Sequence, residues 1–117
     1  MRAVFLDFGS VSRDDLDCTA LGQAISPWCY YHVSSDQEIL QRICDAEVVV
    51  SNKVFLNRST IEAATRLKLI CVAATGYNNV DLEAAAEHEI AVCNVRNYAT
   101  PSVVQHVFLL MLSLIRH

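Results

Sequence analysis

The sequence predicts an α/β protein with a parallel five-stranded sheet, because short apolar runs alternate five times with helical patterns. Most connections between these runs are short, as in chains built from successive strand–helix–strand units. The 117 residues suffice for one domain with its own core. The simplest right-handed assembly is flavodoxin-like, with strand order 2-1-3-4-5, helices on both faces and a long C-terminal helix.

Each predicted strand is a short apolar run that ends in polar or turn-forming residues. Buried strands of a parallel sheet have this composition. The strands are expected at residues 3–6, 28–32, 47–50, 69–73 and 90–92. No linker, repeat or low-complexity tract divides them, so we expect a single sheet.

The predicted helices are marked by residues that favour helix N-termini. Ser35 with Glu38, and Ser59 with Glu62, have the spacing of capping boxes, and Asp81 is placed to begin a helix. Acidic residues just after Ser12 suit a first helical turn. The helices are expected at residues 12–24, through Ile39, Leu40 and Ile43, at 60–66, at 81–89, and from Pro101 to the end of the chain.

The last predicted helix has a wide apolar surface. Thr100 suits its N-cap and Pro101 its first position, where the missing N–H is not needed. At about 100° per residue, the polar side chains form one stripe of roughly 100°. The stripe consists of Ser102, Gln105, His106, Ser113 and Arg116. One sheet cannot cover the rest, so we expect a larger protein or a homo-oligomer formed through Pro101–Arg116.

Composition and charge exclude several classes of function. A chain with 53% hydrophobic and 19% charged residues is expected to fold. The net charge of −4, without a basic stripe, argues against binding to nucleic acid or to an anionic membrane surface. The apolar run at 103–115 is too short and too interrupted to span a membrane, and the N-terminus lacks the pattern of a secretory signal.

The five cysteines lack the spacing of a zinc site or a redox pair. Cys71 and Cys93 fall inside apolar strand patterns, where cysteine acts as a small hydrophobic residue. No metal site is predicted. A reducing compartment is expected, and therefore a cytoplasmic location.

The candidate ligand-binding residues follow the third and fourth predicted strands. Asn52 and Lys53 come after the third strand, and Thr75–Tyr77 after the fourth. In open α/β sheets, ligands bind outside the carboxyl ends of the strands, at the point where the strand order reverses. That point lies between the first and third strands, so we expect these loops and Phe8–Gly9 to lie side by side.

Each candidate has two interpretations. Lys53 either attracts an anionic ligand or is simply solvated, and Asn52 either binds a ligand or caps its loop. Thr75–Tyr77 either surrounds a ligand or forms only a tight connection. Gly76 either adopts a positive φ or lets a ligand approach its N–H. His106 is expected at an interface rather than in catalysis, and His32 and His88 are expected to face solvent.

Two types of site that suit this topology are excluded. The three glycines, Gly9, Gly22 and Gly76, do not form the G-x-G-x-x-G turn that holds phosphate. A phospho-acceptor receiver domain would use Asp7 and Thr75, but it also needs a carboxylate after the third strand. Ser51-Asn52-Lys53 occupies that place.

Three blocks of sequence resemble one family. They are Ser-Asn-Lys-Val at 51–54, Ala-Ala-Thr-Gly-Tyr-Asn-Asn-Val-Asp at 73–81, and the segment from Val92 to Leu112 that contains Asn-Tyr-Ala-Thr-Pro. At this spacing they are similar to the N-terminal part of the D-isomer-specific 2-hydroxyacid dehydrogenases, and the glycerate dehydrogenase (hydroxypyruvate reductase) branch is the nearest match.

The resemblance implies a flavodoxin-like substrate domain at residues 1–99 and a helix at 100–117 that passes between two domains. It implies that Asn52, Lys53, Val54, Thr75 and Gly76 hold the carboxylate of a small 2-keto or 2-hydroxy acid, partly through backbone N–H groups. It also implies that the helix start, with cofactor-binding residues Thr100 and Val104, approaches the nicotinamide of NAD or NADP.

The resemblance places the remaining machinery outside this chain. The family's catalytic Arg, Glu and His, and the NAD-binding Rossmann domain, are expected downstream, and none of the four histidines here matches the catalytic one. A segment returning from the C-terminus normally completes the substrate domain. The chain alone is therefore expected to be inactive and to bind no cofactor. The competing hypothesis is an independent flavodoxin-like binding module that dimerises through its last helix.

Overall fold

The computed structural model describes residues 1–116 and contains one parallel sheet of five strands, in the order β2-β1-β3-β4-β5. The strands are β1 (Ala3–Phe5), β2 (Trp28–Tyr30), β3 (Val48–Ser51), β4 (Leu69–Val72) and β5 (Ala91–Asn94). Every neighbouring pair is parallel. The predicted α/β class, strand order and approximate strand positions are confirmed.

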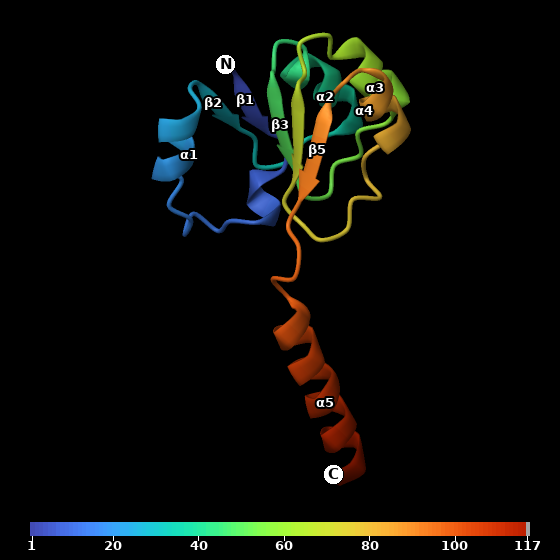
Figure 1. The fold of residues 1–117 in the computed structure, drawn as a ribbon. Helices are drawn as coiled ribbons and strands as arrows, with labels where there is room; N and C mark the ends of the chain where they lie inside the picture. The colour runs from blue at the N-terminus through green and yellow to red at the C-terminus, as the bar shows by residue number, and fades with distance from the viewer. Residues whose placement is uncertain (117) are drawn as a thin grey trace.

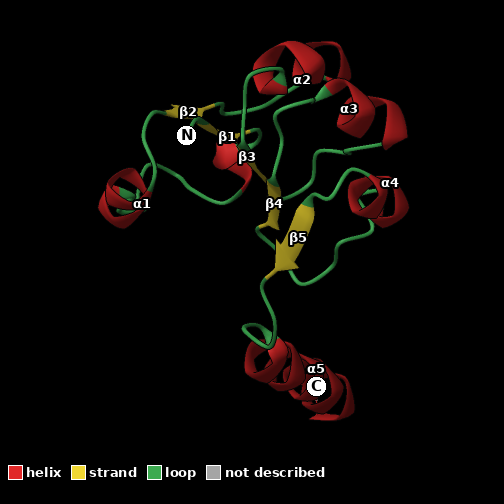
Figure 2. Ribbon diagram, turned by 45° about the horizontal axis from the view of Figure 1, so that its top comes forward, coloured by secondary structure: helices red, strands yellow, loops and turns green. Residues whose placement is uncertain are grey.

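The helices cover the two faces of the sheet unequally. They are η1 (Phe8–Ser10), α1 (Thr19–Ala24), α2 (Asp36–Ile43), α3 (Arg58–Ala63), α4 (Leu82–Glu87) and α5 (Thr100–Arg116). Figure 2 shows α2, α3 and α4 together on one face, and α1 on the opposite side near β2. In the part of the chain that the structure describes, no helix covers β4 and β5 on that opposite side.

The hydrophobic core lies between the sheet and the helices α2 to α4. Val4, Val49 and Ile70 occupy matching positions on three neighbouring strands and are fully buried. Helical residues such as Ile43 and Ile61 close over them. Because side chains alternate along a strand, the residues between these positions point to the less covered face.

Two predicted helix starts are wrong. The first helix begins at Thr19 instead of Ser12, because the polar side chains before it bond to nearby backbone: the Asp15 carboxylate accepts from the N–H of Arg13 at 2.9 Å. This bond lowers the pKa of Asp15. The third helix is capped by Asn57, whose side chain accepts from the N–H of Thr60, so Ser59-x-x-Glu62 is not its capping box.

The other two predicted caps are confirmed. The Glu38 carboxylate accepts from the N–H of Ser35 at 2.9 Å, and bonds to Ser35 lower the pKa of Glu38. The Asp81 carboxylate accepts from the N–H of Ala84 at 2.9 Å. Both caps satisfy backbone donors that a helix start leaves without partners.

The last helix, α5, projects from the domain (Figure 1). Its bounds are Thr100–Arg116, one residue earlier than the predicted start, because the carbonyl of Ala99 accepts from the N–H of Val103 at 3.0 Å. None of its residues is buried. The radius of gyration is 16.9 Å, against about 13 Å for a compact chain of this length. The predicted end, residue 117, lies outside the described residues.

Within residues 1–116, no helix combines the length and the apolar character needed to cross a membrane.

Candidate functional site

Asp7, which follows β1 after Leu6, holds the loop that follows β3. The residue is only 5% exposed, and its carboxylate accepts from the backbone N–H groups of Asn52 at 2.9 Å and Lys53 at 2.6 Å. A buried carboxylate is stable when donors face it in this way. Asp7 therefore fixes the position of the candidate binding loop, across 45 positions of sequence.

The same loop is also held by neutral side chains. The carbonyl of Val54 accepts from the hydroxyl of Ser51 and from the side-chain amide of Asn79, each at 3.0 Å. Ser51 and Asn79 are both buried. The side-chain amide of Asn52 donates to Ser10 Oγ at 2.9 Å. Asn52 thus helps to order its own loop, as the second interpretation of this residue expected.

The loop after β4 lies beside the loop after β3, as predicted. The N–H of Leu56 donates to the carbonyl of Asn79 at 2.8 Å, which joins the two segments. A hollow of about 230 Å³ lies between them, and Asn52, Lys53 and Gly76 are among the residues that line it. The structure therefore brings Asn52, Lys53 and Gly76 together, whereas Thr75 and Tyr77 line a separate hollow with Arg96.

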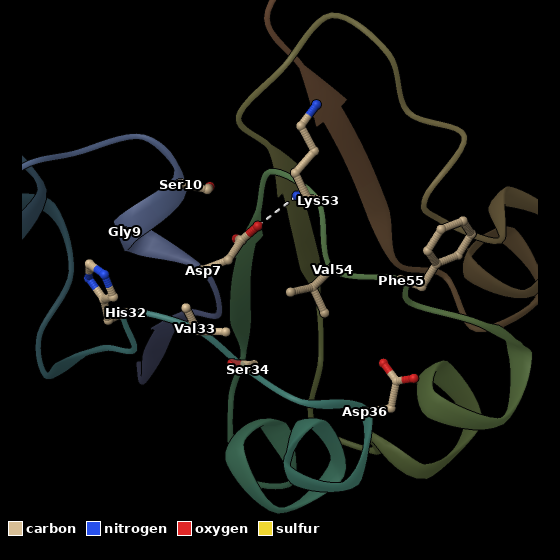
Figure 3. Close-up of a pocket in the computed structure, with 10 residues that line it drawn as sticks. All are labelled: Asp7, Gly9, Ser10, His32, Val33, Ser34, Asp36, Lys53, Val54 and Phe55. Carbon is tan, nitrogen blue, oxygen red and sulfur yellow. Dashed lines mark hydrogen bonds between the residues drawn. The ribbon is translucent and has the colours of Figure 1, made fainter.

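A larger hollow, of about 550 Å³, opens beside Asp7 and is lined partly by Lys53, Val54 and Phe55. Figure 3 shows the hydrogen bond from the Lys53 backbone to Asp7, with the Lys53 side chain extending away from that carboxylate. Among the described residues, Lys53 is the only lysine or arginine that lines either this hollow or the one between the two loops. It also forms no ion pair with any of them.

Gly9 and Gly76 play different roles at this edge of the sheet. A Cβ at Gly9 would collide with the ring of His32, so close packing requires glycine there. His32 and His88 are exposed, as predicted. Gly76 has no positive φ, and a Cβ there would only touch Asn78 Oδ1 at 3.5 Å. A positive φ is therefore not the reason for glycine at position 76. Of the two interpretations of Gly76, the one that remains is that a ligand can approach its N–H.

Only some of the candidate residues have a backbone N–H group that is free to bind a ligand. The N–H groups of Asn52 and Lys53 already donate to Asp7, so any ligand contact of these residues must come from their side chains. Within residues 1–116, the N–H groups of Val54, Thr75 and Gly76 donate to no protein acceptor. These three N–H groups and the Lys53 ammonium are the candidate donor set for a small carboxylate. Lys53 lines both the hollow between the two loops and the larger hollow beside Asp7, whereas Val54 lines only the larger one, Gly76 only the smaller one, and Thr75 neither.

The two expected cofactor-binding residues lie apart from this donor set. Thr100 and Val104 are exposed on α5, which leads away from the sheet (Figure 1). No hydrogen bond joins either residue to the loops at 52–54 and 75–76 within residues 1–116. The glycines at 9, 22 and 76 lie in separate elements, so the described residues form no glycine-rich turn for the pyrophosphate of a dinucleotide.

The sheet topology defines an α/β domain of the class in which ligands bind outside the carboxyl ends of the strands. Residues 8–110 match the family model for the D-isomer specific 2-hydroxyacid dehydrogenase, catalytic domain. The chain belongs to this family, which confirms the resemblance seen in the sequence.

Curated relatives agree with this assignment. The chain is 40% identical to the glycerate dehydrogenase of Methylorubrum extorquens, over 98% of this chain and 36% of that protein. It is 35% identical to the hydroxypyruvate reductase of Blautia hydrogenotrophica, over 100% of this chain and 37% of that protein. The chain thus spans little more than a third of the length of these relatives.

A solved structure shows the same arrangement. The NAD-dependent formate dehydrogenase from Staphylococcus aureus, in complex with NAD, superposes with a TM-score of 0.80 at 27% identity. The match covers 99% of this chain and 39% of the formate dehydrogenase.

Proposed function

We propose that this chain is the substrate domain of an NAD(P)-dependent oxidoreductase that interconverts a small 2-keto acid and its D-2-hydroxy acid. The observation that carries the proposal is the candidate donor set, which consists of the N–H groups of Val54, Thr75 and Gly76, free within residues 1–116, and the Lys53 ammonium. Asp7 and Asn79 hold the loop that carries Lys53 and Val54. The names of the relatives support a substrate of the size of hydroxypyruvate. Lys53 supplies the positive charge, and the N–H groups orient the carboxylate.

The proposal divides the work between two domains. Residues 1–99 hold the acid, and the helix at 100–117 passes between this domain and a Rossmann domain that binds NAD or NADP. That second domain supplies the hydride donor and the Arg, Glu and His, with Thr100 and Val104 facing the nicotinamide. The chain alone would bind the acid weakly and would be inactive. The five free cysteines support a reducing compartment, and we place the protein in the cytoplasm.

The exposed α5 supports a second candidate function. An independent binding module that dimerises through Pro101–Arg116 would also cover this apolar helix. The donor set suits either function, and the match of residues 8–110 to the dehydrogenase family favours the dehydrogenase.

Titration of the ¹⁵N-labelled chain with hydroxypyruvate tests the donor set. We expect millimolar binding that shifts the amide resonances of Val54, Thr75 and Gly76, because a carboxylate accepts from these three groups. The amides of Asn52 and Lys53, which already donate to Asp7, serve as internal controls and should shift less. Glycolaldehyde, which lacks the carboxylate, should leave all five unchanged. An acid that shifts none of the three amides, or an equal response to glycolaldehyde, would count against the proposal.

A further inference from the structure

Cys71 and Cys93 face each other on the side of the sheet where no helix of the described residues covers β4 and β5 (Figure 2). They are Cα partners in the parallel pairing of β4 with β5, and their Sγ atoms lie 3.4 Å apart. The spacing of the cysteines in the sequence does not indicate this pair, because the two residues meet only through the register of β4 with β5. Cys93 is exposed and Cys71 is half-buried.

The backbone geometry suits a disulfide between these residues. Neighbouring strands lie about 4.8 Å apart, within the range of roughly 4.4–6.8 Å between the Cα atoms of disulfide-linked residues. The two sulfurs need to approach by about 1.4 Å to reach bonding distance. Rotation about the side-chain bonds can supply this movement, because no described helix packs over the pair (Figure 2).

The two sulfurs have unequal surroundings. Burial and the adjacent sulfur of Cys93 raise the pKa of the Cys71 thiol to about 12. Cys71 therefore keeps its proton, and the exposed Cys93 is left as the sulfur that meets an oxidant from solvent. The other three cysteines have no such partner: the Sγ of Cys44, for example, donates to the carbonyl of Gln41.

We propose that Cys71 and Cys93 form a reversible disulfide when the protein meets a hydroperoxide. The Cys93 thiolate attacks one peroxide oxygen, the O–O bond breaks, and the released hydroxide takes up a proton to leave as water. The resulting sulfenic acid of Cys93 is attacked by the Cys71 sulfur, whose proton goes to the departing hydroxyl. Two thiols are oxidised to one disulfide, and one hydrogen peroxide is reduced to two waters.

The disulfide would tie β5, the strand that leads to α5, to β4, the strand that leads to the loop at Thr75 and Gly76. Oxidation would then fix the two strands that carry the candidate ligand-binding edge and the exposed helix. The inference does not depend on which ligand the loops bind.

Brief treatment of the folded, reduced chain with hydrogen peroxide, followed by alkylation and peptide mapping, tests this inference. We expect the loss of two thiols, one linked peptide pair containing Cys71 and Cys93, and full recovery of both thiols with dithiothreitol. Only the pair should end as a disulfide, because Cys44 has no neighbouring cysteine that could trap its sulfenic acid.

Matched variants separate the pair from general thiol oxidation. Cys44→Ser should leave the disulfide unchanged, whereas Cys71→Ser should leave Cys93 as a sulfenic acid that dimedone traps. Oxidation of Cys18, Cys29 or Cys44 while Cys71 and Cys93 stay reduced would overturn the inference. Linkage of Cys93 to another cysteine or to a second chain would do the same.

Discussion

Replacing Asp7 by alanine is expected to destabilise the protein and to release the loop after β3. The substitution removes the acceptor of the N–H groups of Asn52 and Lys53 in a partly buried site. An unsatisfied buried donor costs about 1–3 kcal/mol, and because Lys53 is exposed to water we expect the free energy of unfolding to fall by about 1–3 kcal/mol in all. Urea denaturation measures this loss, and amide hydrogen exchange shows whether Asn52 and Lys53 open to solvent.

Two variants serve as controls for the Asp7 prediction. Ser10→Ala removes only the exposed acceptor for the side chain of Asn52, and we expect a loss of less than about 1 kcal/mol. Asp7→Asn keeps one oxygen acceptor and should fall between the other two variants. A free energy of unfolding for Asp7→Ala within about 0.5 kcal/mol of the parent value would match an ordinary surface substitution. That result would show that Asp7 does not hold the loop.

The chain is expected to self-associate through α5, and Met111→Glu should weaken that association strongly. Met111 is 52% exposed and lies on the helix opposite the polar stripe. Burial of one such side chain contributes about 1.5–3 kcal/mol, and a symmetric dimer buries two. A charge at this position should therefore raise the dissociation constant by at least about 100-fold. Light scattering over a range of concentrations measures the change.

Gln105→Glu provides the matched control, because it adds the same charge within the polar stripe. It should leave the dissociation constant within about threefold of the parent value, a change of less than 1 kcal/mol. A chain that stays monomeric at high concentration before any substitution would contradict the expectation that α5 needs a partner.

The strand positions and sheet order could be predicted because they depend on local composition and on the handedness of crossovers. The apolar run at Leu69–Val72 and the capping box at Ser35 illustrate this: each is encoded within a few residues. The start of α1 was misplaced because Asp15 bonds to nearby backbone instead of supporting a helix. The cap of α3 was misassigned because Asn57, two residues earlier, competes with Ser59 for the same role.

The contacts that shape the candidate site could not be predicted, because they join distant parts of the chain. Asp7 reaches Asn52 across 45 positions, and Asn79 reaches Val54 across 25. The resemblance to the family implied a role for the loop at 52–54. It did not indicate that the Asp7 carboxylate accepts hydrogen bonds from two N–H groups of that loop. Cys71 and Cys93 likewise meet only through the register of β4 with β5.

A chimaera tests most directly the claim that this chain forms one side of a keto-acid site. The chain would replace the corresponding third of the glycerate dehydrogenase of Methylorubrum extorquens, with oxidation of NADH and NADPH followed in the presence of hydroxypyruvate. Binding of the reduced nucleotide, measured by fluorescence, shows that the chimaera is folded. The account predicts oxidation that depends on hydroxypyruvate, with a KM that rises in the Lys53→Met variant. A folded chimaera that binds the nucleotide but reduces no 2-keto acid would contradict the account.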